Sequence, residues 1–94
     1  MNKVTLNHDY GNDVLYVKQQ NARIVISEER EELAIILDYD QNKHVVGLRV
    51  LFASTLATEE WNKIKNDIPF DMFDIVSEWI DKSEGLQHPL YAVK

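Results

Sequence analysis

Four aspartates stand where the chain is expected to turn, and they have the clearest capacity for chemistry. Asp9 and Asp13 flank one stretch of turn-forming residues, and Asp38 and Asp40 begin a second. If the two turns met, the four carboxylates would offer oxygen ligands to a hard cation such as Ca²⁺. Aspartate is also common in turns because its side chain accepts hydrogen bonds from nearby backbone amides. The spacing matches no EF-hand loop, so we interpret these residues as turn formers and predict no metal or cofactor.

The other residues that often carry catalysis lack the neighbours that catalysis needs. The histidines stand far apart without a paired spacing such as HExxH, the serines lack a GxSxG turn, and the glycines stand singly. The chain contains no cysteine, so it has no thiolate that could act as a nucleophile or as a zinc ligand. We therefore predict that the protein is not an enzyme. The residues considered are His8, His44, His88, Ser27, Ser54, Ser77, Ser83, Gly11, Gly47 and Gly85.

Charge and hydropathy narrow the range of partners. The formal net charge is −6, and residues 57–84 carry eight acids against three bases. An acidic chain repels phosphate backbones, so we predict no direct binding to nucleic acid. The longest unbroken apolar run, residues 33–37, is far shorter than the roughly 20 residues that span a bilayer. We expect a soluble, cytoplasmic protein that does not enter a membrane.

The elements that position these residues form a strand half followed by a helical half, which is the α+β pattern. Residues 3–7 alternate polar and apolar side chains, and the run 14–18 is rich in strand-forming residues. Turn-forming residues that include Gly11 and Asn12 lie between them, so residues 3–18 predict a hairpin. Residues 33–52 predict a second hairpin, in which Val46, Leu48, Val50 and Phe52 share one face. We expect a small antiparallel sheet of about four strands.

Two segments of the strand half depart from this alternation. Residues 24–26 are apolar and predict a short strand, whereas the charged run 27–32 predicts an exposed loop or an irregular edge. Gly47 interrupts the last strand. A glycine inside a strand indicates a bulge or the close approach of another group.

Two amphipathic segments predict helices at about 58–67 and 71–84 that cover the sheet. Pro69 ends the first, since the residue before proline avoids the helical region. Gly85 is placed to end the second in a left-handed conformation. We expect a single domain over residues 1–94, with a sheet portion (4–54), a helical portion (57–85) and an extended C-terminal tail (86–94).

Residues 4–54 carry two sets of short motifs in a fixed order. The first is residues 9–17, Asp-Tyr-Gly-Asn-Asp-Val-Leu-Tyr-Val, and the second is residues 36–40 and 46–51, which ends at Ala53-Ser54. Together these motifs resemble a bacterial domain-of-unknown-function family, number 2283, with Arg49 where the family has glutamate. The resemblance implies a small sheet domain and no activity, and the helical residues 57–94 extend beyond the part that it covers.

Two hypotheses of function stay open. The first is a non-catalytic interaction module that binds a protein partner or itself, as a homodimer, through its helices. The second is an acidic inhibitor or antitoxin-like protein, phage-encoded in one version, that blocks a basic nucleic-acid-binding partner. Apolar helix faces support the first and an acidic helix stripe supports the second, although core packing and a solvated face are the commoner explanations of these two patterns. The candidate surface comprises Trp61, Ile64, Phe73, Trp79, Asp74, Glu78 and Asp81.

Overall fold

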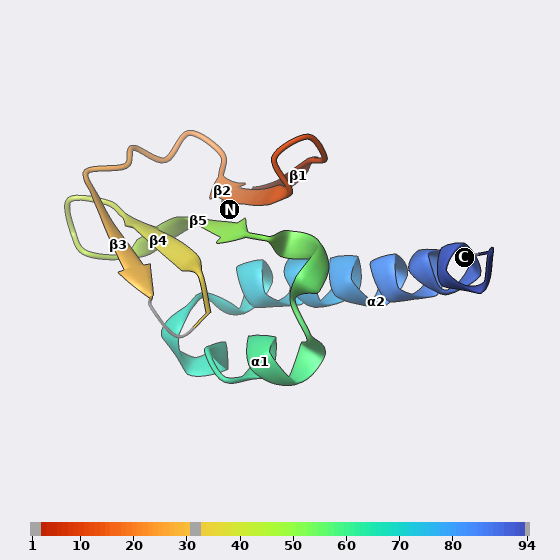
Figure 1. Ribbon diagram of the computed structural model, residues 1–94. Helices are drawn as coiled ribbons and strands as arrows, with labels where there is room; N and C mark the ends of the chain where they lie inside the picture. The colour runs from red at the N-terminus through yellow and green to blue at the C-terminus, as the bar shows by residue number, and fades with distance from the viewer. Residues whose placement is uncertain (1–2, 31–32, 94) are drawn as a thin grey trace.

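The computed structural model describes residues 3–30 and 33–93, with side chains described as far as residue 82. One antiparallel sheet has the order β1-β2-β5-β4-β3 and packs against helices on one face (Figure 1). The α+β class is confirmed, but the sheet has five strands instead of four. The strands are β1 (Val4–Asp9), β2 (Val14–Gln19), β3 (Ile26–Arg30), β4 (Ile35–Tyr39) and β5 (Val45–Leu51).

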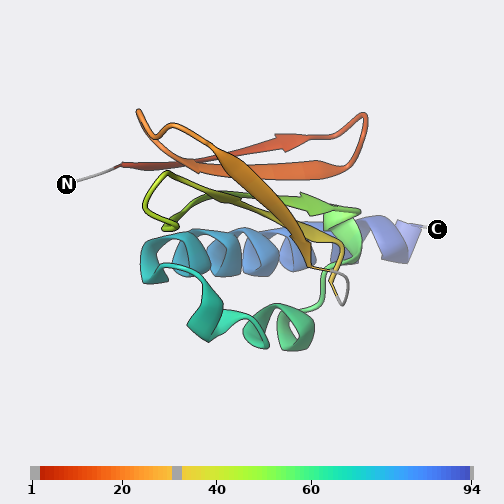
Figure 2. The ribbon, with the colours of Figure 1, turned by 90° about the vertical axis from the view of Figure 1, so that its left-hand side faces the viewer.

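The additional strand, β3, includes most of the charged run that predicted a loop. It pairs along the outer side of β4, with Ser27 opposite Asp38 and Glu29 opposite Ile36. Its side chains are exposed apart from a half-buried Arg30. An edge strand with solvent on both faces needs no apolar alternation, so the usual sequence signal of a strand is missing here. Residues 20–25 carry the chain from β2 to this far edge (Figure 2).

The core lies between the sheet and the helices. Leu15, Val17, Leu37, Leu48 and Val50 point from the sheet to this side and are at most 1% exposed. Register explains why they share a face, because Leu48 stands opposite both Val17 and Leu37. The helices contribute further buried side chains, namely Trp61, Ile64, Ile68, Met72, Phe73, Val76 and Ile80.

Gly47 has the close neighbours that its position in a strand predicts. It stands opposite Asp38, next to a register shift that gives β5 one extra residue. A Cβ at this position would lie 3.2 Å from Asp38 Oδ2 and 3.3 Å from the Val17 carbonyl oxygen. A bulge and a close approach therefore occur together, which leaves room for the buried Asp38 carboxylate.

The chain leaves β5 through a left-handed residue. Phe52 has a φ of 53°, and the 3-10 helix η1 (Ala53–Thr55) follows it. This conformation ends the strand and leaves the Phe52 side chain 65% exposed, so the prediction that Phe52 shares a face with the buried Leu48 and Val50 is wrong. The left-handed backbone at Phe52 breaks the alternation of side chains that a continuing strand would show.

The two predicted helices differ from their expected bounds. The first is shorter, with α1 (Thr58–Asn62) and a separate 3-10 helix η2 (Lys65–Asp67), because Ile64 leaves the helical conformation. Ile68 is extended before Pro69, as predicted. The second, α2 (Phe70–Val93), is longer and does not end at Gly85. Glycine permits a left-handed stop without requiring it, and its cost inside a helix is only about 1 kcal/mol.

Figures 1 and 2 agree that α2 runs along one face of the sheet, that α1 lies beyond it, and that the C-terminal end of α2 projects past the strands. The segment expected as an extended tail is helical as far as Val93. In the part of the chain that the structure describes, no helix combines the length and the apolar character needed to cross a bilayer.

Candidate functional site

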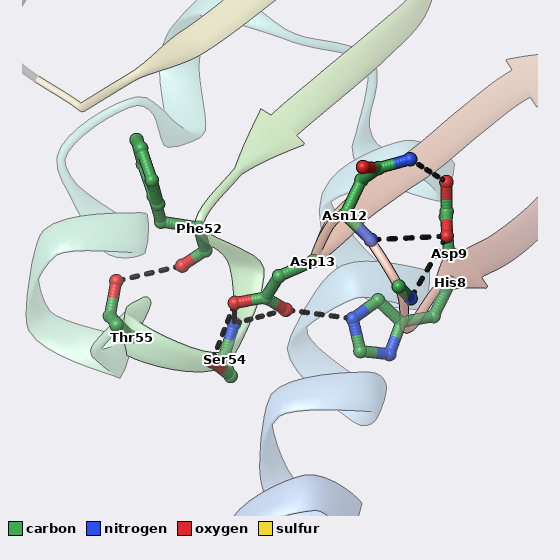
Figure 3. Close-up of polar contacts among 8 residues, drawn as sticks. His8, Asp9, Asn12, Asp13, Phe52, Ser54 and Thr55 are labelled. Atoms are coloured by element: carbon green, nitrogen blue, oxygen red, sulfur yellow. Dashed lines mark hydrogen bonds and ion pairs between the residues drawn. The ribbon is translucent and has the colours of Figure 1, made fainter.

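Among the described residues, the carboxylate of Asp13, at the end of the β1–β2 turn, accepts hydrogen bonds from two distant parts of the chain. Its two oxygens each accept the backbone N–H of Ser54 at 3.1 Å, and Oδ2 also accepts the Ser54 hydroxyl at 2.6 Å (Figure 3). The Asp13 carbonyl oxygen accepts the N–H of Ala53 at 2.9 Å. Asp13 therefore joins the first hairpin to η1, a segment about forty residues later in the chain.

His8 donates to the same carboxylate from the core side of β1. Its Nε2 lies 2.9 Å from Asp13 Oδ1, and its side chain is 10% exposed. The imidazole packs against Tyr10, at 4.2 Å between ring centroids, and meets Trp79 edge to face at 5.0 Å. Nδ1 is buried and has no hydrogen-bond partner among the described residues. Contact with Trp79 links the turn to α2.

The order of Ser54, Asp13 and His8 differs from the order of the three groups that activate a serine nucleophile. Such a site needs histidine between serine and carboxylate, so that the imidazole removes the hydroxyl proton. Here the carboxylate lies between Ser54 and His8, and both donate to it. The arrangement holds segments together and places no histidine base on Ser54.

Hydrogen bonding governs the ionisation of both aspartates in this region. Burial raises the pKa of Asp13, but hydrogen bonds from Ser54 and His8 lower it by more, so that it falls below the ordinary value of 3.8. The pKa of Asp9 is also lowered, chiefly by the Asn12 side chain, which donates to Oδ2 at 2.9 Å. Both carboxylates are therefore held in their charged form.

These lowered pKa values predict a loss of stability in acid. A carboxyl group whose pKa is depressed by folding stabilises the fold above its unfolded pKa, and that contribution disappears as pH falls through the folded pKa. We expect the urea midpoint to fall between about pH 5 and pH 2, and to fall less in Asp13→Asn. The exposed Asp74→Asn serves as the control and should follow the parent chain. If the urea midpoint fell with pH equally in Asp13→Asn and in the parent chain, the role of Asp13 would be contradicted.

A second polar network lies on the sheet face that no helix covers. Arg49 Nη2 donates to Asp38 Oδ1 at 2.9 Å and to Ser27 Oγ at 3.2 Å, and Ser27 donates to Asp38 at 2.7 Å. Asp38 is 3% exposed, so the guanidinium compensates a buried charge. The network ties β3, β4 and β5 together across the sheet.

The four aspartates do not lie together in the fold. Asp9 accepts the amides of Gly11 and Asn12, and Asp40 accepts those of Asn42 and His44. The two turns lie at opposite ends of β5, because Val14 stands opposite Leu51 whereas Asp38 stands opposite Gly47. The turn interpretation is thus confirmed for Asp9 and Asp40. Within the described residues, no group of three or more histidine, aspartate or glutamate side chains is placed to hold a metal ion.

The candidate helix surface divides into buried and exposed parts. Trp61 and Ile64 are at most 2% exposed and Phe73 is 8% exposed, so these three belong to the core. Trp61 donates from Nε1 to Ser77 Oγ at 3.1 Å and stacks on Phe73. Trp79 is half-buried against the sheet. The three acids of the set, Asp74, Glu78 and Asp81, are exposed on α2.

Large apolar side chains are exposed outside the helix faces that the sequence suggested as an interaction surface. Ile24 and Val25, on the connection into β3, are 40% and 53% exposed, and Ile26, the first residue of β3, is 57% exposed. Tyr16, on the uncovered sheet face, is 41% exposed and lines a hollow of about 320 Å³ together with Ile24 and Arg49. Short apolar runs in sequence do not reveal whether a helix will cover them, so only the fold identifies this surface.

Comparison with known proteins points to the same part of the chain. The family model described as "Protein of unknown function (DUF2283)" matches residues 6–54, a segment that contains His8, Asp13 and Ser54. The chain is similar to the uncharacterized protein MJ0789 of Methanocaldococcus jannaschii, with 34% identity over 70 residues. That match covers 73% of this chain and 59% of the relative's length. No solved structure matches.

Proposed function

Since this chain belongs to the DUF2283 family, whose description states no activity, we propose from its geometry that it is a non-catalytic interaction module that associates with a second copy of itself. The proposal rests on the uncovered face of the sheet and on its two open edges. Helices cover one face only, and β1 and β3 each pair on one side only among the described strands. An open sheet edge offers unpaired backbone groups to another chain.

Polar side chains that could take part in catalysis instead form hydrogen bonds within the fold, and this supports a binding role. Asp13 binds Ser54 and His8, and Asp38 binds Arg49 and Ser27. Large apolar side chains remain exposed meanwhile, which is the surface property expected of an interaction module. The small core adds a reason for association, because a domain of this size gains stability by burying further apolar area.

Sedimentation equilibrium of the full chain tests the proposal. We expect a dimer whose population rises between about 1 and 100 micromolar, the range in which weak sheet-edge contacts dissociate. A monomer at every concentration in that range would contradict self-association.

A second candidate function is favoured by the exposed acids of α2. Asp74, Glu78 and Asp81 recur at helical spacing on the solvent side, where a basic protein would meet them without competition from the core. Under this alternative, the chain is an acidic inhibitor of a basic nucleic-acid-binding partner. The same sedimentation experiment separates the candidates, because an inhibitor of this kind stays monomeric until its partner is added.

A further inference from the structure

The geometry of β1 points to a specific dimer surface, and this inference rests on the proposed self-association. We infer that a second copy pairs antiparallel along β1, with Leu6 at the two-fold axis. The Lys3 carbonyl oxygen accepts the N–H of Gln20 at 2.6 Å, which marks Lys3 as bonded toward β2. Antiparallel ladders alternate at every residue, so the backbone groups of Val4, Leu6 and His8 point to the open side.

These outward groups match one another in the inferred register. With Leu6 opposite Leu6 of the second copy, Val4 stands opposite His8, and all of these residues present backbone groups to the interface. Lys3 then stands opposite Asp9, an opposite-charge pair that occurs twice by symmetry. A shift by two residues keeps outward groups opposite one another but separates Lys3 from Asp9. Charge therefore selects this register.

The apolar layer of the core is also open at this edge. Val4 and Leu6, on the helix side of β1, are only partly buried, as are Ile75 and Trp79 on α2. Trp79 reaches β1 through its contact with His8, so these side chains belong to one end of the core. A second copy would bring its own Val4 and Leu6 against this end and exclude water from both.

The opposite edge is less suited to self-pairing. β3 carries Glu28 and Glu29 in succession, and both side chains are exposed. Two copies that pair about either residue would place glutamates opposite each other, which destabilises a sheet. Acidic residues on an edge strand are a common protection against such pairing. We therefore assign the dimer contact to β1 alone.

Disulfide trapping tests the register directly, because the chain has no cysteine. In this register Thr5 stands opposite Asn7 of the second copy as a non-bonded pair, with Cα atoms about 4.5 Å apart, within the range of a disulfide. Both side chains are exposed. Thr5→Cys and Asn7→Cys chains are mixed in equal amounts, oxidised mildly and separated without reductant. We expect the mixed disulfide to exceed either same-variant disulfide several-fold.

The controls use the same chemistry at other positions. Thr5→Cys alone and Asn7→Cys alone should cross-link poorly, because like positions lie diagonal to each other. Glu29→Cys on β3, mixed with either variant, should show no preferred product. A mixed yield in the statistical ratio, or equal trapping with Glu29→Cys, overturns the β1 assignment.

Charge reversal gives an independent readout by sedimentation. Lys3→Glu would place glutamate opposite Asp9 twice per dimer, and we expect the dissociation constant to rise roughly tenfold. Lys63→Glu, at the exposed residue that follows α1, makes the same change far from β1 and should leave the constant unchanged. Equal effects of the two changes overturn the inference.

The trapping and sedimentation results also distinguish this inference from the proposed function. A dimer that lacks the Thr5–Asn7 preference overturns the β1 surface and leaves self-association standing. A chain that is monomeric throughout overturns both.

Discussion

Replacing Asp13 with asparagine is expected to lower the free energy of unfolding by about 2 to 3 kcal/mol. Hydrogen bonds to a charged group contribute about 1.5 to 3 kcal/mol each, but the Asp13 side chain is 29% exposed, so water recovers part of the loss. Asparagine preserves the shape and tolerates the positive φ of 54° at this position. The change therefore removes the charge that Ser54 and His8 share without straining the turn.

Urea unfolding of Asp9→Asn provides the matched control for this prediction. Asp9 also caps the β1–β2 turn, but its bonds stay within that turn and are exposed to solvent. We expect Asp9→Asn to lower the urea midpoint much less than Asp13→Asn does, because water replaces hydrogen bonds that are exposed. If the two substitutions cost the same, the link between the hairpin and η1 is not what makes Asp13 important.

Replacing Arg49 with methionine is expected to cost about 2 to 3 kcal/mol. The substitution leaves the Asp38 carboxylate buried with Ser27 as its remaining side-chain partner among the described residues. Breaking a buried ion pair costs about 3 to 5 kcal/mol, and we expect less here because the Arg49 side chain is 36% exposed. Methionine keeps the apolar stem that packs on the sheet, so the loss reports chiefly on charge.

A double-mutant cycle measures this coupling. Asp38→Asn together with Arg49→Met removes both charges, and we expect the double variant to be more stable than Arg49→Met alone. Lys18→Met is the control, since Lys18 is an exposed base on the same face of the sheet. An Arg49→Met variant no less stable than Lys18→Met would contradict the assigned role of the pair.

Local chemistry accounts for what the sequence predicted well. Asp9, Gly11 and Asn12 form a turn because their own side chains and backbone satisfy one another within a few residues. The alternation of residues in β1 and β5 placed Leu6 and Leu48 on the core side. Gly47 indicated a bulge or a close approach, and the close approach is to Asp38, whose carboxylate would lie 3.2 Å from a Cβ at this position.

Long-range contacts account for the differences. Helix periodicity correctly grouped Trp61, Ile64 and Phe73 on apolar faces, but whether such a face meets a partner or the core depends on where the sheet lies. The acid-rich β3 forms a strand because it pairs with the edge of β4, and the residues of β3 themselves do not indicate this pairing. The bond between Asp13 and Ser54 likewise joins residues that only the antiparallel pairing of β2 with β5 brings together.

The amino-acid sequence by itself determined the α+β class, the first hairpin, a bulge or close approach at Gly47 and the family, because each depends on neighbouring residues or on a pattern carried along the chain. Only the tertiary structure decided which aspartate would join distant segments, which apolar faces would be covered and which strand edges would stay open. The physical reason is that burial and strand pairing are properties of surfaces assembled from distant residues. No single segment encodes its partner.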